Sequence, residues 1–110
     1  MKFSINIPAY KSKFLGKTLE SVLSQTYIDY EVIIVDDHSP EDIFSIVNQF
    51  NDKRIRYYRN EVNKGAINVV DNWNICLSYS NGDYVICMGD DDMLSPDALE
   101  KYAYYINKYP

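Results

Sequence analysis

The sequence predicts an α/β fold: a three-layer α/β/α arrangement around a mostly parallel, Rossmann-like sheet. Segments with the apolar pattern of strands alternate with segments of helical periodicity, which is typical of parallel sheets joined by right-handed crossovers. The second strand segment, YEVIIVDD, is a nearly continuous β-branched run of the kind buried on both faces of a sheet. With 110 residues, of which 46% are apolar, the chain can form one core, so we predict a single domain over residues 1–110.

Four segments are predicted to be strands. FSINI alternates apolar and polar residues until the PAY sequence ends it. RIRYYR alternates with period two, and its arginine and tyrosine content suggests an exposed strand at the sheet edge. The predicted strands cover residues 3–7, 30–37, 54–59 and 83–89.

The segments between and after the strands are predicted to be helices, because their apolar residues recur at helical spacing. Ser12 is the expected cap of the first helix. Ser39, followed by Pro40 and two acidic residues, is the expected N-cap of the second, and a similar Ser-Pro-Asp start recurs before the last helix. The predicted helices cover residues 12–25, 39–50, 66–80 and 95–109.

Composition excludes several classes of protein. The formal net charge of −5 argues against nucleic-acid binding, which needs a basic face. Cys76 and Cys87 lie in apolar stretches without a CxxC motif, so we expect buried free thiols in a reducing cytosol. No apolar run approaches the roughly 20 residues that span a bilayer. We therefore predict a cytoplasmic protein, with peripheral contact at the inner face of the membrane left open.

Polar clusters stand at three predicted strand ends, where ligands bind in parallel sheets. They are PAYK after the first strand, DDHS after the second and GDDD after the fourth. Three successive aspartates, residues 90–92, repel one another unless they are solvated or are neutralised by a divalent cation, hydrogen-bond donors or protonation.

The acidic cluster is the candidate for holding a phosphorylated ligand. No GxGxxG motif follows the first strand, and GKT at residues 16–18 lacks the glycine that a P-loop needs. Carboxylates could instead hold Mg²⁺ or Mn²⁺, which often use one or two carboxylates together with substrate phosphates. The alternative is a solvated turn that leads into the last helix.

Two further residues are candidates for nucleotide contacts. One of the two aspartates Asp36 and Asp37, which end the second strand, could accept a hydrogen bond from a base or a ribose hydroxyl, whereas the alternative is that one of them caps the next helix. Tyr10 could stack on a base, as aromatic faces do.

The chain resembles the family 2 glycosyltransferases, which have the GT-A fold. The resemblance rests on SINIPAYK, on LESVLSQTYIDYEVIIVDDHS, on NGDYVICMGDDDMLSPDAL and, more weakly, on DNWN. It implies the nucleotide-binding half of a GT-A enzyme, which uses a nucleotide-diphosphate sugar and usually Mg²⁺ or Mn²⁺ at a DxD-type motif.

The resemblance also implies roles for individual residues. The implied nucleotide-binding residues are Pro8, Ala9, Tyr10, Asp37, Asn68 and Asp90, and the implied metal ligands are Asp91 and Asp92. In many relatives the first aspartate of the motif falls where Gly89 stands. An arginine that some members use for the nucleotide has no counterpart here, although Asn68 or Lys64 lies in that neighbourhood.

By the same resemblance the reaction is an inverting transfer from a donor, a UDP-sugar being favoured, to an acceptor hydroxyl. The acceptor would be a carbohydrate or a lipid-linked intermediate of polysaccharide biosynthesis. Relatives are usually more than twice as long, so we expect the catalytic base beyond Pro110 and a donor-binding half truncated from a longer enzyme. Apolar surface exposed by truncation could promote a homodimer.

Two alternatives remain open. A sugar nucleotidyltransferase shares the broad architecture, but it would need a glycine-rich basic loop where PAYKSKFLG stands. A non-catalytic module could instead use the acidic edge to bind a cation or a basic partner.

Overall fold

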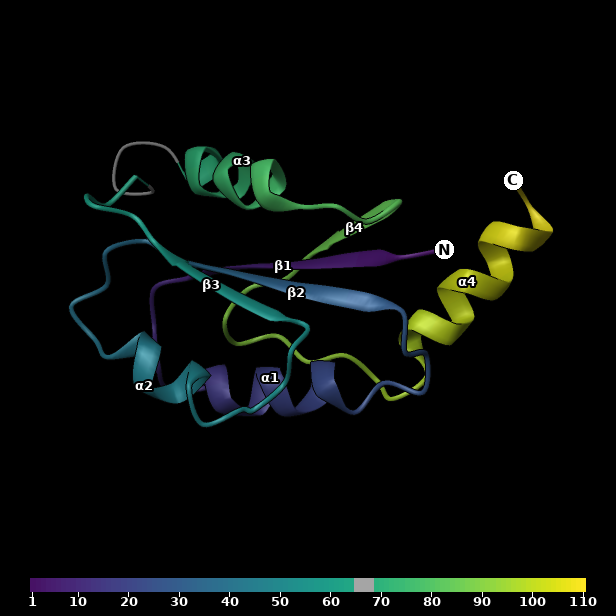
Figure 1. Ribbon diagram of the computed structural model, residues 1–110, viewed down its shortest axis with the longest axis horizontal. Coiled ribbons are helices and arrows are strands. Elements are labelled where there is room, and N and C mark those ends of the chain that lie inside the picture. The colour runs from purple at the N-terminus through teal and green to yellow at the C-terminus, as the bar shows by residue number, and fades with distance from the viewer. Residues whose placement is uncertain (65–68) are drawn as a thin grey trace.

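A four-stranded parallel sheet forms the centre of the structure, a computed structural model that describes residues 1–64 and 69–110 (Figure 1). The strands are β1 (Phe3–Ala9), β2 (Tyr30–Asp36), β3 (Ile55–Arg59) and β4 (Tyr84–Cys87). Their order is β3-β2-β1-β4, and every neighbouring pair is parallel. The predicted α/β class is therefore confirmed, and the third strand lies at the sheet edge as expected.

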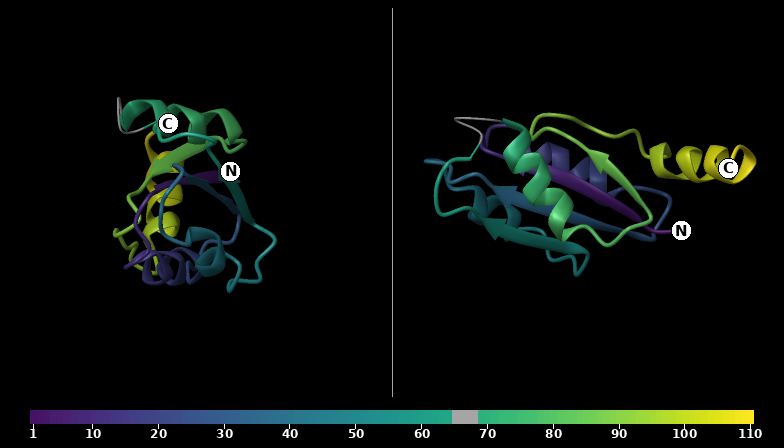
Figure 2. Two further views of the ribbon diagram at one scale, coloured as in Figure 1. Left: turned by 90° about the vertical axis from the view of Figure 1, so that its left-hand side faces the viewer. Right: turned by 90° about the horizontal axis from the view of Figure 1, so that it is seen from above.

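Helices cover both faces of this sheet (Figures 1 and 2). The helices α1 (Leu15–Leu23) and α2 (Ile43–Val47) lie on one face, and α3 (Val69–Tyr79) lies on the other. The last helix, α4 (Ala98–Lys108), projects beyond the end of the sheet at which the strands begin. All strands point away from α4, so their carboxyl ends gather at the opposite edge.

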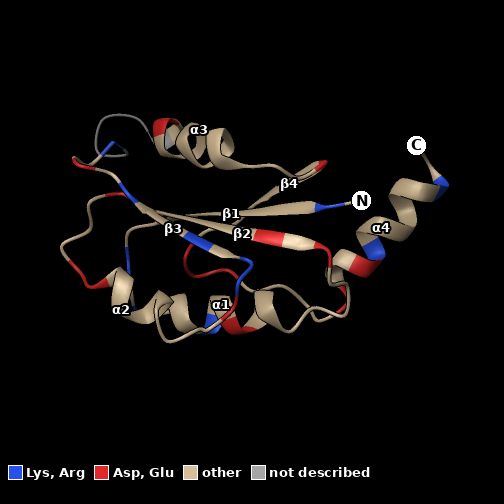
Figure 3. Ribbon diagram, viewed as in Figure 1, with Lys and Arg blue, Asp and Glu red and all other residues tan. Residues whose placement is uncertain are grey.

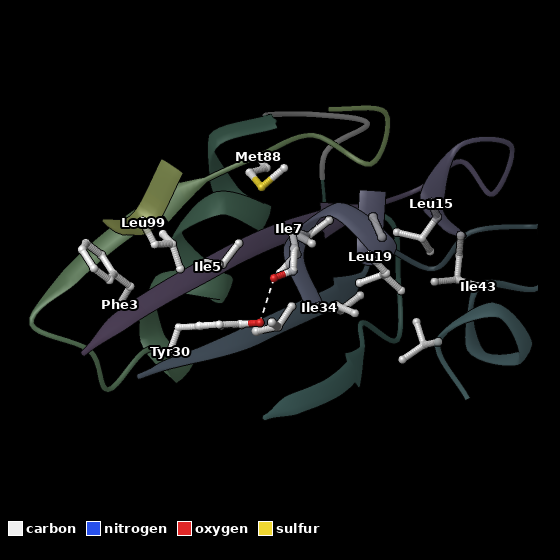
Figure 4. Close-up of a cluster of buried hydrophobic side chains, with 14 of the residues drawn as sticks. Phe3, Ile5, Ile7, Leu15, Leu19, Tyr30, Ile34, Ile43, Met88 and Leu99 are labelled. Atoms are coloured by element: carbon white, nitrogen blue, oxygen red, sulfur yellow. Dashed lines mark hydrogen bonds between the residues drawn. The ribbon is translucent and has the colours of Figure 1, made fainter. Parts of the chain in front are cut away.

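The main core lies between the sheet and α1 (Figure 4). Ile5 and Ile7 of β1 and Ile34 of β2 point to this side, where they pack with Leu15 and Leu19 of α1. Because successive strand residues face opposite sides, the intervening residues of β2 form a smaller cluster under α3. That cluster contains Ile33, Val35 and Cys76. β2 is buried along its whole length, as its β-branched sequence predicts.

A buried carboxylate joins the strands near their amino ends. Glu31 accepts hydrogen bonds from Ser4 Oγ at 2.6 Å and from the backbone N–H of Asn81 at 2.5 Å. Its other oxygen lies 2.7 Å from the Arg56 guanidinium. Burial on its own raises the pKa of Glu31, but the hydrogen bonds and the arginine outweigh burial and hold it below its ordinary value.

The two serines predicted to cap helices have other roles. Helix α2 begins at Ile43 rather than at residue 39, and its N-cap is Asp42, whose carboxylate accepts from the Ser45 N–H at 3.1 Å. The hydroxyl of Ser39 instead donates to the Tyr10 carbonyl. Helix α1 begins at Leu15, and Ser12 donates to Glu41 at 2.5 Å. Both capping predictions were wrong because these hydroxyls connect the loops that follow β1 and β2.

The two cysteines differ in exposure, so the prediction that both are buried was wrong. Cys76 is buried under α3, where burial raises the pKa of its thiol to about 12. Cys87 is exposed at the end of β4, a short strand at the edge of the sheet.

None of the helices in the described part of the chain combines the length and the apolar character needed to cross a bilayer.

Candidate functional site

A pocket of about 350 Å³ opens at the carboxyl edge of the sheet. It is formed by the loops after β1, β2 and β4 together with the first two turns of α3. Its walls are Pro8, Ala9, Tyr10, Asp37, Asn72, Trp73, Cys87, Met88, Gly89, Asp90 and Asp92. The structure thus brings together six of the eight residues predicted to bind nucleotide or metal. Of the other two, Asn68 lies outside the described residues, and Asp91 lines a neighbouring hollow.

Asp90 fastens the loop after β4 to the loop after β1. Its Oδ2 accepts hydrogen bonds from the backbone N–H groups of Tyr10 and Lys11, both at 2.8 Å. The backbone carbonyl of Asp90 accepts a further bond from Thr18 Oγ1 of α1 at 3.1 Å. The sequence suggested a divalent cation, hydrogen-bond donors or protonation as ways to neutralise the aspartates, and at Asp90 the structure shows hydrogen-bond donors. Its carboxylate therefore fixes one wall of the pocket against another.

The next two aspartates belong to the loop after β4, which is coloured red in Figure 3, and they line two different hollows. Asp92 lines the pocket, and its Oδ2 accepts from the Gly89 N–H at 2.7 Å. Asp91 lines a neighbouring hollow of about 290 Å³ together with Phe14, Lys17 and Met93.

Gly89 permits this close turn. A Cβ atom at position 89 would lie 3.0 Å from Asp91 Oδ1 and 3.2 Å from Asp92 Oδ2. A larger residue would therefore press against both carboxylates.

Asp37 is held by a polar network that crosses to α3. Its Oδ1 accepts from Asn60 Nδ2 at 3.0 Å and from the backbone N–H of Lys64 at 2.7 Å. Asn60 Nδ2 also donates to Asn72 Oδ1 at 2.8 Å, and Asn72 Nδ2 donates to the Val35 carbonyl at 3.4 Å. The network holds the carboxylate of Asp37 at the pocket wall and holds α3 on the sheet.

The neighbouring Asp36 has a structural role. Its Oδ1 accepts from the Ser39 N–H at 2.9 Å, and its Oδ2 accepts from the Tyr57 hydroxyl at 2.6 Å and lies 3.4 Å from Arg59 Nε. Burial, together with the hydrogen bond to Asp36, raises the pKa of Tyr57. Of the two aspartates that end the second strand, Asp37 therefore lines the pocket, and Asp36 holds the turn.

The carboxylates offer a sparse set of metal ligands. Within residues 1–64 and 69–110, no three histidine, cysteine, aspartate or glutamate side chains lie close enough together to hold a metal ion on their own. Asp90 and Asp92 line the pocket, but each already accepts at least one backbone N–H. A divalent ion in this pocket would need further oxygen ligands from a bound molecule.

Sequence reasoning missed Asn60, Asn72 and Trp73. Asn60 follows the third strand and gave no signal of its own. The DNWN sequence contains both Asn72 and Trp73, and it was recognised only as a weak part of the resemblance. Its position at the start of the third helix, above the carboxyl edge of the sheet, could have marked both residues as candidates.

Comparison with known proteins identifies the family. The family model described as Glycosyl transferase family 2 matches residues 4–110, which is nearly the whole chain. The chain belongs to this family. Within this family 2 glycosyltransferase chain, the matched range includes every residue of the pocket.

Two curated relatives from Escherichia coli are named as glucosyltransferases that use UDP-Glc and α-D-GlcNAc-diphosphoundecaprenol. WfaP is 40% identical to this family 2 chain over 90 residues, which cover 81% of the chain and 35% of WfaP. WfgD is 33% identical over 98 residues, covering 88% of the chain and 38% of WfgD. The chain thus spans little more than a third of the length of either relative.

The fold of this family 2 chain is close to that of a solved structure. The crystal structure of S. aureus TarS superposes with a TM-score of 0.91 at 28% sequence identity, covering 99% of this chain and 33% of that chain. The GT-A fold implied by the sequence is therefore confirmed.

Proposed function

We propose that this chain is the donor-binding part of a glycosyltransferase that transfers a sugar, with inversion, from a nucleotide-diphosphate donor to an acceptor hydroxyl. Membership of family 2 supports the reaction class. S. aureus TarS has been crystallised with UDP and with UDP-GlcNAc, at 28% and 26% identity to this chain, and WfaP is named for its UDP-Glc donor. A UDP-sugar is therefore the favoured donor.

One observation carries the proposal: the pocket has a carboxylate at each side and an aromatic residue between them. Asp37 follows β2, Tyr10 follows the central strand β1, and Asp92 follows β4, so they line the carboxyl edge in this order. We propose that Asp37 accepts a hydrogen bond from the base and that Tyr10 contacts the base face. The diphosphate would then extend toward the loop after β4.

The carboxylates of the pocket fit a divalent ion that is also coordinated by oxygen atoms of the bound nucleotide sugar. Mg²⁺ and Mn²⁺ bind hard oxygen ligands and often use one or two carboxylates together with substrate phosphates. Of the two predicted metal ligands, we favour Asp92, because it lines the pocket, whereas Asp91 lines the neighbouring hollow. When bound, such an ion would stabilise the negative charge of the departing diphosphate.

Asp90 would act by holding the pocket together. Its carboxylate keeps the backbone of Tyr10 and Lys11 beside the loop that carries Asp92.

We propose that the base that deprotonates the acceptor lies outside residues 1–110, because the chain spans only 35% of WfaP. We also propose a lipid-linked acceptor at the inner face of the membrane, since WfaP and WfgD are named for a diphosphoundecaprenol-linked substrate.

Calorimetry with UDP, with and without Mn²⁺, tests this function. We expect UDP to bind, and to bind more tightly when Mn²⁺ is present. Asp92→Asn should remove most of the effect of Mn²⁺ while the circular dichroism spectrum stays unchanged, and Asp91→Asn is the matched control in the same loop. Equal and negligible heats with and without Mn²⁺ would refute the proposal, and an effect of Mn²⁺ lost only in Asp91→Asn would reverse the ligand assignment.

A further inference from the structure

Trp73 is a prominent pocket residue to which the proposed function gives no role. It is the single tryptophan of the chain and lies in the second turn of α3. Its side chain lines the pocket and is 47% exposed. A large aromatic side chain left half in water beside a ligand pocket has apolar surface to offer to a ligand.

The orientation of α3 determines where Trp73 lies. Asn72 and Cys76 are buried on the helix face that meets the sheet, where Asn72 donates to the Val35 carbonyl and Cys76 packs with Ile33 and Val35. Consecutive helix residues are rotated by about 100° from one another. Trp73 therefore leaves the flank of the helix, where it shares the pocket wall with Met88 after β4.

The helix turn that carries Trp73 is linked to Asp37 through hydrogen bonds of the preceding residue. That residue, Asn72, accepts from Asn60, and Asn60 donates to Asp37. One hydrogen-bonded network thus fixes both the carboxylate that is proposed to read the base and the helix that carries the indole. The other aromatic residue of the pocket wall is Tyr10, from the loop after β1.

We propose that Trp73 packs against the nucleobase of the donor, so that the base contacts aromatic side chains from two elements, α3 and the loop after β1. This inference rests on the proposed donor-binding function and adds a residue that determines affinity for the base. The contact is apolar and planar. It favours a nucleoside with an unsaturated ring and is indifferent to the diphosphate.

The intrinsic fluorescence of Trp73 provides a direct test, because no other tryptophan contributes. With excitation selective for tryptophan, we expect UDP and uridine to change the emission in a saturable manner. Inorganic pyrophosphate should not change it. Saturation of the pocket by UDP in calorimetry without a change in emission would overturn the role of Trp73 and leave the proposed function standing. If UDP does not bind at all, both proposals fail.

Variants separate a base contact from a merely structural role. We expect Trp73→Ala to weaken UDP binding by about tenfold, the size of a lost aromatic contact. Trp73→Phe should retain most of the affinity, which keeps the test valid if the alanine variant folds poorly. Leu77→Ala is the matched control, because Leu77 is exposed one turn further along α3 and does not line the pocket. Equal losses in Trp73→Ala and Leu77→Ala, or no loss in either, would contradict the proposal.

Discussion

Asp90 shows at the scale of a residue how a crowded acidic motif is accommodated. One oxygen of its carboxylate accepts hydrogen bonds from the backbone N–H groups of Tyr10 and Lys11, which are distant from Asp90 in the sequence. The sequence predicts an aspartate cluster at a strand end, because the apolar run stops at that point. It could not predict which partner neutralises Asp90, because that partner is a pair of backbone amides from another loop and leaves no pattern of side chains.

Replacing Asp90 should loosen the pocket before any ligand binds. Asp90→Ala removes the acceptor of the Tyr10 and Lys11 amides, but both amides are exposed and water can replace the carboxylate, so we expect the free energy of unfolding to fall by about 1 kcal/mol. Hydrogen exchange at these two amides should become faster. Asp90→Asn keeps an oxygen acceptor and should have a smaller effect, and Asp29→Ala, at an exposed aspartate, is the control. Unchanged exchange at both amides would show that the carboxylate does not hold them.

At the scale of elements, the sequence predicts that a strand or helix exists more reliably than it predicts where the element begins. All four strands and four helices lie where the periodicity places them. Helix α2 nevertheless begins at Ile43, because Ser39 bonds to the loop after β1 instead of capping the helix. Cys87 is exposed because edge position and cover depend on strand order, which the local pattern does not encode.

Helix α1 should be the element most sensitive to loss of apolar volume. Leu19 is fully buried between α1 and the sheet, so Leu19→Ala should lower the free energy of unfolding by about 2–5 kcal/mol through lost burial and the cavity that remains. Urea denaturation measures the change. Glu20→Ala, at the adjacent exposed position, should change stability by less than about 0.5 kcal/mol. Similar losses in the two variants would contradict the packing described for α1.

At the scale of the whole molecule, the two ends of the sheet serve different purposes. The amino end is closed by the ion pairs and hydrogen bonds of Glu31, and the carboxyl end holds the pocket. The general position of the pocket could be predicted, because ligands bind at the carboxyl ends of parallel strands. The contribution of α3 could not, because it depends on how Asn72 seats the helix on the sheet. That the chain is part of a longer enzyme, and that it forms a homodimer, stay predictions.

The closed amino end should make the molecule sensitive to acid. The pKa of Glu31 is lowered in the folded state, so its ionised form stabilises the fold above the ordinary glutamate pKa of 4.5. This contribution is lost as the pH falls through and below that value. Glu31→Gln should therefore flatten the acid side of the stability profile. At neutral pH it should lower the free energy of unfolding by about 2 kcal/mol, because Arg56 loses its charged partner and keeps only the Tyr79 carbonyl and the Tyr58 hydroxyl.

Denaturation in urea at a series of pH values measures both effects. Glu61→Gln is the control because Glu61 is exposed. An acid limb that is equally steep in the wild type and in Glu31→Gln would show that other carboxylates cause the loss of stability.

The clamp between Asp90 and the backbone of Tyr10 and Lys11 has a consequence for recognition. Two walls of the cavity are spaced before any nucleotide arrives, so little ordering of the protein is left for the moment of association. Such preorganisation lowers the entropic cost of complex formation. Removing these hydrogen bonds should therefore appear in calorimetry mainly as a less favourable binding entropy, even for a ligand that does not contact Asp90.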